Sequence, residues 1–150
     1  MIKIKYIISV SLLIWVISFC SCSDDSSEPT PTELEQQLEA LMNEGSKWVL
    51  GNDGVLKDGF DVRGQFTGFK LIIGNKTYTT ENGLSPVWET SGVWDFQNDN
   101  PNLVLRDGVT SITLSLSGGN LTMTFMADGA STGGRTKSVS GEYEFHLVGE

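Results

Sequence analysis

The C-terminal third of the chain alternates between apolar and polar side chains. In residues 121–125 three apolar side chains are separated by two threonines, and residues 112–116 follow the same pattern. In residues 139–147 glycine and apolar side chains alternate with serine, glutamate and histidine. A period of two is typical of antiparallel strands that bury one face and expose the other. These three segments are therefore predicted to be half-buried β-strands.

Turn-forming residues separate further short segments of strand-like composition. Gly74-Asn75, Asp107-Gly108 and the run 118–120 are typical of tight hairpin connections. About eight or nine strands are predicted, at residues 47–50, 61–66, 68–73, 76–80, 92–97, 103–106, 112–116, 121–125 and 139–147. Consecutive hairpins predict an all-β fold, a small antiparallel up-and-down barrel, because closing the sheet removes its exposed edges. A two-sheet sandwich is the alternative.

Residues 33–45 have the period of a helix rather than that of a strand. Thr32 and Glu35 have the spacing of a capping box, in which each side chain bonds to the backbone of the other residue. Gly45 is a natural stop. The apolar side chains fall on one helical face and are Leu34, Leu38, Leu41 and Met42. We expect a short amphipathic helix that docks on the β domain of residues 46–150, with a partner-binding helix as the alternative.

The N-terminal segment has the features of a secretory signal. Lys3 and Lys5 precede an apolar run at residues 6–19 that only serines interrupt. The run is short for a transmembrane helix, which needs about 20 apolar residues to cross the bilayer core. Residues 1–21 are therefore predicted to be a cleaved signal peptide, and an uncleaved anchor helix is the alternative.

The residues Phe19-Cys20-Ser21-Cys22 resemble the lipobox of bacterial lipoproteins, which places a small residue directly before the modified cysteine. The resemblance implies that Cys22 carries three acyl chains, such as palmitate, at the start of the mature protein. One acyl chain binds a membrane only marginally, whereas two or more give stable attachment. A disulfide between Cys20 and Cys22 is disfavoured because a single intervening residue would strain the ring.

Residues 22–32 are polar and interrupted by proline, so we expect a flexible tether there. The acidic cluster of Asp24, Asp25 and Glu28 resembles the surface-export signal of Bacteroidota lipoproteins. This resemblance implies a lipid anchor in the outer membrane and display on the cell surface. An ordinary solvated linker is the alternative.

The charge of the chain narrows the classes of partner. The 150 residues include 10 basic and 19 acidic side chains. Removal of residues 1–21 takes away Lys3 and Lys5 and no acid, so 8 basic residues face 19 acidic ones, a formal net charge of −11. Such a field repels phosphate backbones and anionic lipid head groups, and no basic run offsets it. Nucleic-acid binding is therefore not expected.

Several β segments resemble the lipocalin-like domains of Bacteroidota lipoproteins. The resemblance covers residues 46–149 and includes Trp48-Val49-Leu50 and the segments 69–78, 91–96, 103–108, 112–116, 121–125 and 141–145. It implies a barrel able to hold a small apolar ligand, and it brings no catalytic residues. Residues 51–64 depart from the pattern because they are rich in glycine and aspartate.

No pattern predicts an enzyme, a metal site or a cofactor. His146 is the single histidine, and alternation places it on the wet face beside Glu144, without the nucleophile that a catalytic relay needs. The loops 52–61 and 98–102 contain Asp and Asn side chains that can bind calcium, although tight turns use the same residues. The glycine-rich run 129–135 lacks the ending of a phosphate loop.

The expected function is ligand binding by the barrel. Six aromatic side chains are candidates for contact with a small apolar or glycan ligand, namely Phe69, Trp88, Trp94, Phe96, Phe125 and Tyr143. Trp88 lies in a turn-rich stretch, so its ring either is exposed for stacking on a sugar or folds onto the barrel end. The alternative function is a structural or interaction subunit of an envelope complex with a filled barrel. Apolar alternation is compatible with both a hollow and a filled barrel.

Overall fold

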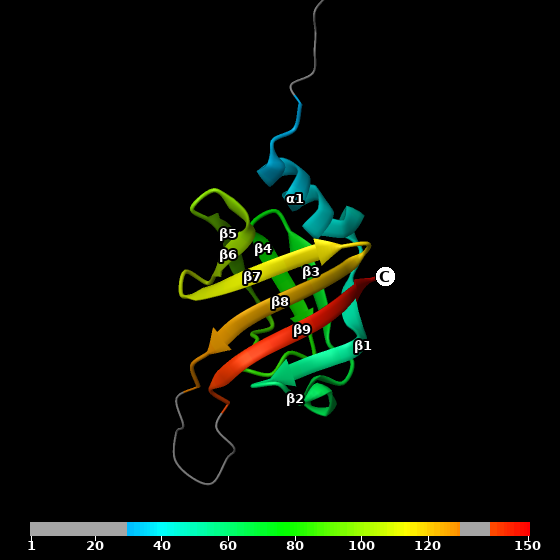
Figure 1. Cartoon of the computed structure of the whole chain (residues 1–150), viewed down its shortest axis with the longest axis vertical. Coiled ribbons are helices and arrows are strands. Elements are labelled where there is room, and N and C mark those ends of the chain that lie inside the picture. The colour runs from blue at the N-terminus through cyan, green and yellow to red at the C-terminus, as the bar shows by residue number, and fades with distance from the viewer. Residues whose placement is uncertain (1–29, 130–138) are drawn as a thin grey trace, which may run out of the picture. The chain divides into compact units, whose positions relative to one another are not determined.

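The computed structural model describes residues 30–129 and 139–150 (Figure 1). The predicted signal peptide, Cys22, the acidic cluster and the segment 130–138 lie outside these residues. Within the described part, no helix is long and apolar enough to cross a membrane.

The helix α1 spans Glu33–Met42 and begins with the predicted capping box. The Glu35 backbone N–H donates to the Thr32 Oγ1 at 3.2 Å, and the Thr32 N–H donates to the Glu35 carboxylate at 2.7 Å. The helix ends at Met42, and its C-cap Asn43 has a left-handed backbone that leads into a 3₁₀ turn, Asn43–Gly45. Leu41 is buried against the barrel, so the apolar stripe serves as a cap on the β domain.

The β domain is a closed antiparallel barrel. Its strands are β1 (Trp48–Lys57), β2 (Phe60–Asp61), β3 (Lys70–Gly74), β4 (Thr77–Glu81), β5 (Ser91–Gln97), β6 (Asn100–Arg106), β7 (Thr110–Ser117), β8 (Asn120–Ala127) and β9 (Gly141–Gly149). From β3 to β9 each strand pairs with the next, and β1 pairs with both β3 and β9. The wall therefore closes, β2 remains as a short hairpin on β1, and the predicted barrel is confirmed over the sandwich.

Alternation along the strands determines which side chains form the core. In β8 the buried side chains are Leu121, Met123, Phe125 and Ala127, and in β9 they are Tyr143, Phe145 and Leu147. The register of the two strands places buried side chains opposite each other, so that Met123 lies opposite Phe145 and Phe125 lies opposite Tyr143.

The prediction of a strand at residues 61–66 is wrong. β2 stops at Asp61, and Arg63–Phe66 form a 3₁₀ helix, η2. The Asp61 carboxylate accepts the Arg63 backbone N–H at 2.8 Å and the Arg63 Nε at 2.9 Å, which turns the chain away from the sheet. The turn carries Phe66 into the core, where it is fully buried.

β1 is longer than the predicted strand 47–50 because it continues after a large bulge. Leu50 pairs with Leu147 and Val55 pairs with Phe145, so residues 51–54 lie opposite the single residue His146. Gly54 has a left-handed φ of +66°, which glycine adopts without strain. The glycine- and aspartate-rich stretch thus bends the strand without breaking the barrel.

The two ends of the barrel differ. One end, here called the helix end, carries α1, whose Leu41 carbonyl accepts the indole N–H of Trp48 at 2.8 Å. The hairpin turns at the helix end are short and include residues 75–76, 98–99 and 118–119. The opposite end, here called the loop end, carries the connections 58–69, 82–90 and 107–109 and the residues 128–129 and 139–140 that flank β8 and β9. In Figure 1, α1 lies at the end of the barrel where β7 and β9 finish.

Aromatic rings fill the loop-end half of the interior. This aromatic cluster consists of Phe66, Phe69, Trp88, Phe125, Tyr143 and Phe145. The Phe145 ring centroid lies 5.0 Å from that of Phe66 and 5.1 Å from that of Phe69. Edge-to-face and stacked pairs at such separations add to the stabilisation from burial.

Candidate functional site

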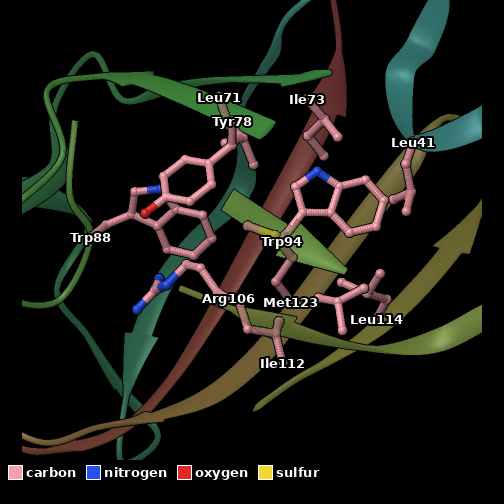
Figure 2. A pocket seen from close by; sticks show the side chains of 11 residues that line it. Leu41, Leu71, Ile73, Tyr78, Trp88, Trp94, Arg106, Ile112, Leu114 and Met123 are labelled. Atoms are coloured by element: carbon pink, nitrogen blue, oxygen red, sulfur yellow. The ribbon is translucent and has the colours of Figure 1, made fainter. Parts of the chain in front are cut away.

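The helix-end half of the barrel contains a small interior cavity (Figure 2). Its volume is about 40 Å³, and apolar atoms line it. Figure 2 shows that Trp94 and aliphatic side chains surround it, among them Leu41, Leu71, Ile73 and Leu114. A small-molecule pocket has a volume of about 300–1,000 Å³. The barrel interior is therefore filled as far as a ligand of that size is concerned.

The six predicted ligand residues do not surround one cavity. Trp88 and Trp94 line the interior cavity, and Phe96 is half-buried with its ring 5.2 Å from that of Trp94. The other three, Phe69, Phe125 and Tyr143, belong to the aromatic cluster. Their burial is explained by packing, and their contact with a ligand stays a prediction.

Trp88 is buried, so the interpretation in which its ring folds onto the barrel end is confirmed and the exposed loop ring is wrong. Only 3% of the residue is exposed. Its ring centroid lies 5.4 Å from that of Phe125 and 5.8 Å from those of Phe69 and Tyr78. A backbone hydrogen bond from Trp88 to Leu84, of 2.9 Å, folds the loop so that the ring enters the barrel. The 82–90 loop thus places a tryptophan ring inside the barrel, where it fills the loop end of the interior.

Arg106 is the one buried charged residue in the described part of the chain, with 6% of its surface exposed. Its guanidinium carbon lies 4.4 Å from the Trp88 ring centroid and 4.9 Å from that of Phe125. In Figure 2 the guanidinium extends away from Trp94, next to Trp88. The Nη2 donates to the Val87 carbonyl at 3.1 Å. Burial lowers the pKa of the guanidinium from its ordinary value.

One donor of Arg106 is left over. Its Nη1 is shielded from solvent and has no hydrogen-bond partner among residues 30–129 and 139–150, and the same holds for the Trp88 Nε1. A buried donor without an acceptor costs about 1–3 kcal/mol. Such groups are uncommon in native proteins and call for a specific explanation.

Asp107 connects Arg106 to the barrel wall. Its Oδ2 lies 3.7 Å from the Arg106 Nε and accepts the Tyr78 hydroxyl at 2.7 Å. Its Oδ1 accepts the Val93 N–H at 2.9 Å. Burial first, and then the hydrogen bond to Asp107, raise the pKa of Tyr78 well above its ordinary value. Both carboxylate oxygens therefore have partners within the protein.

A groove at the loop end opens over Arg106. This mouth groove has a volume of about 650 Å³. Its described lining comes from the 82–90 loop, the β6–β7 turn and the end of β8, and consists of Pro86, Glu89, Ser91, Arg106, Asp107, Val109, Thr110, Ser111, Met126, Ala127 and Asp128. Val109 is 80% exposed and Met126 is 58% exposed. The groove therefore combines hydroxyls, carboxylates and apolar side chains around one buried guanidinium.

The remaining sequence candidates lie outside this site. His146 is on the outer face of β9, where its Nε2 lies 2.6 Å from the Glu144 carboxylate. Among the described residues, no group of three or more His, Cys, Asp and Glu side chains is arranged to hold a metal ion. Most of the glycine-rich run 129–135 falls in the part of the chain that is not described.

The inward position of Arg106 could have been inferred from strand alternation, although no catalytic motif includes this residue. In β6 the buried side chains are Val104 and Arg106, two positions apart. Strand alternation therefore places this arginine on the inner face, and a charged residue on an inner face is rarely buried unless paired. The groove itself depends on how loops far apart in the sequence meet.

Comparisons with protein-family models, with curated proteins and with solved structures find no match to this chain.

Proposed function

We propose that the chain is a lipid-anchored surface lipoprotein of the outer membrane that binds a small glycan in the mouth groove. The observation that carries the proposal is the mouth groove itself, in which hydroxyls, carboxylates and apolar side chains line one hollow together with the buried Arg106. The groove volume of about 650 Å³ falls within the range of small-molecule sites.

The lining of the mouth groove suits a sugar. Sugar hydroxyls both donate and accept hydrogen bonds, and the groove offers the hydroxyls of Ser91, Thr110 and Ser111 beside the Glu89 and Asp128 carboxylates. The apolar C–H face of a sugar ring has Val109 and Met126 to pack against. An apolar ligand inside the barrel is not favoured, because the interior cavity measures about 40 Å³. The ligand site of this proposal is thus the mouth, and the barrel is its support.

Titration with uncharged oligosaccharides tests the binding proposal. We expect the intact protein in detergent to bind trisaccharides of N-acetylglucosamine or of glucose with saturable heat in isothermal titration calorimetry. The hydrogen-bond donors and acceptors of the groove supply the favourable enthalpy. No saturable signal with either sugar would refute a glycan-binding groove.

Membrane attachment through Cys22 is supported by the lipobox-like residues and by the tether that follows them. We expect the Cys22→Ala variant to leave the membrane fraction, because acyl chains supply the binding energy for stable attachment. Fractionation of cells that produce each form measures the effect, and Cys20→Ala is the matched control that keeps attachment. Protease accessibility on intact cells tests surface display. Equal membrane retention of both variants would contradict the anchor.

A second candidate function is a structural subunit of an envelope complex. The filled interior favours it, and so do three exposed apolar side chains at the loop end, Phe60 at 76%, Val109 at 80% and Met126 at 58% exposure. Neither candidate is an enzyme. Cross-linking in cells that reproducibly captures one envelope protein through the loop end, together with failed sugar titrations, would favour the subunit.

A further inference from the structure

We propose that α1 is a hinged cap, which lifts from the helix end of the barrel while the strands stay paired, and that Gln37 keeps this cap easy to open. Lifting of the cap does not depend on ligand binding in the mouth groove. The predicted tether of residues 22–32 leads directly into α1. The cap is therefore the first element of the domain that a pull on the N-terminal side of the chain would reach.

α1 is held on the barrel by few contacts. It packs against β3 and β6, and Leu41 is its one fully buried residue. Leu38 is partly buried against the core. The Leu41 carbonyl accepts the Trp48 indole N–H at 2.8 Å, which ties the end of the helix to β1. Elements with few buried apolar contacts open at a lower free energy than the strands of a core.

One shielded polar group opposes docking of the helix. Gln37 lies on the same helical face as Leu34 and Leu41, three positions after the first and four before the second. Its Nε2 is shielded from solvent and has no hydrogen-bond partner in the described part of the chain. Water would solvate this amide once the helix lifts. The docked state therefore carries the cost of an unmade hydrogen bond, which the open state does not.

A left-handed turn connects the cap to the barrel. Asn43, Glu44 and Gly45 have φ angles of +47°, +55° and +81°. Glycine adopts such angles freely, whereas the side chain of Glu44 strains the backbone there. Glu44 and Gly45 are exposed, and a side chain at Gly45 would meet no atom within 4 Å. The turn therefore has room to move and relieves strain when its angles change, as suits a hinge at the end of an element.

Hydrogen exchange on the intact protein in detergent, followed by NMR, measures the opening. The reporters are the backbone amides of Leu41 and Met42 and the indole N–H of Trp48. A lone helix of 10 residues is marginal in water, so its amides exchange once it lifts. We expect the three reporters to share one protection factor, lower than those of the amides in β8 and β9. Their exchange should also depend less on urea, because lifting one helix exposes less surface than unfolding the barrel.

Two neighbouring glutamines provide a matched pair of variants. Gln37→Met removes the shielded donor and keeps an unbranched side chain. Gln36→Met is the control, because Gln36 is exposed and its Nε2 donates to the Pro31 carbonyl at 2.9 Å. We expect Gln37→Met to raise the protection of the reporters about 5- to 150-fold, the equivalent of one unmade buried hydrogen bond. Gln36→Met should change it by less than about twofold.

Three results would overturn the cap. The reporters could exchange with the protection and urea dependence of β8 and β9, which would make α1 an integral part of the barrel. The helix amides could exchange fast while the Trp48 indole stays protected, which would show fraying of the helix without lifting. Equal shifts in protection for the two glutamine variants would show that Gln37 does not control the opening.

Discussion

Replacing Trp88 with alanine is expected to lower the free energy of unfolding by about 3–5 kcal/mol, the cost of truncating a buried aromatic core residue. The residue is 3% exposed, and its ring meets those of Phe69, Tyr78 and Phe125. Its face also lies against the Arg106 guanidinium, at 4.4 Å. Alanine would leave a cavity at the centre of the barrel mouth and would remove the aromatic cover of a buried charge.

Urea denaturation followed by far-UV circular dichroism measures this loss. Phe60→Ala is the matched control, because Phe60 is also aromatic and lies at the loop end but is 76% exposed. Exposed positions of this kind change stability by less than about 0.5 kcal/mol. If the two variants lose similar, small amounts of stability, then Trp88 does not plug the barrel.

The barrel wall is largely predictable from the sequence. The alternation in residues 112–116, 121–125 and 139–147 reflects a sheet that buries one face, and the short turns between segments leave few alternatives to hairpins. Backbone pairing of β1 with β9 is long-range. It follows from the need to remove exposed edges rather than from any local pattern.

The secondary structure of the connection between β1 and β3 could not be predicted from local sequence patterns. Residues 61–66 alternate like a strand, yet the Asp61 side chain takes the Arg63 backbone N–H, and the Val62 N–H bonds to the Val55 carbonyl at 2.9 Å. These bonds depend on the bulge in β1, which brings Val55 back into register. Side-chain competition for backbone groups therefore overrides the strand pattern there.

Strand alternation likewise does not show whether the barrel interior is hollow or filled. Inward side chains of the strands are the same in both cases. The volume is taken up by Phe66 and Trp88, which come from η2 and the 82–90 loop rather than from the wall. Trp88 lies in a turn-rich stretch and Phe66 in a segment predicted to be a strand of the wall, so their entry into the core from η2 and the 82–90 loop could not be predicted from a period. The 82–90 loop fills the barrel interior and also lines the mouth groove. The candidate site therefore lies at the mouth and not, as the sequence predicts, in the interior.

Replacing Arg106 with methionine is expected to separate ligand binding from stability. Methionine keeps an unbranched apolar side chain next to Trp88 and Phe125, whose rings lie against the guanidinium carbon, but it carries no charge and no donor. Asp107 keeps its hydrogen bonds from the Tyr78 hydroxyl and the Val93 N–H, so it is not left as an unpartnered buried charge. We therefore expect the free energy of unfolding to change by less than about 2 kcal/mol, the upper range of a lost cation–π contact.

Binding should respond far more strongly. A hydrogen bond to a charged donor contributes about 1.5–3 kcal/mol, so the dissociation constant for the N-acetylglucosamine trimer should rise about 10- to 100-fold. Lys76→Met is the control, because it removes an exposed positive charge from a turn at the helix end, far from the groove. Calorimetry and urea denaturation on the same preparations measure both quantities. A stable Arg106→Met variant that binds the trimer as tightly as the original protein would show that the guanidinium does not contact the ligand.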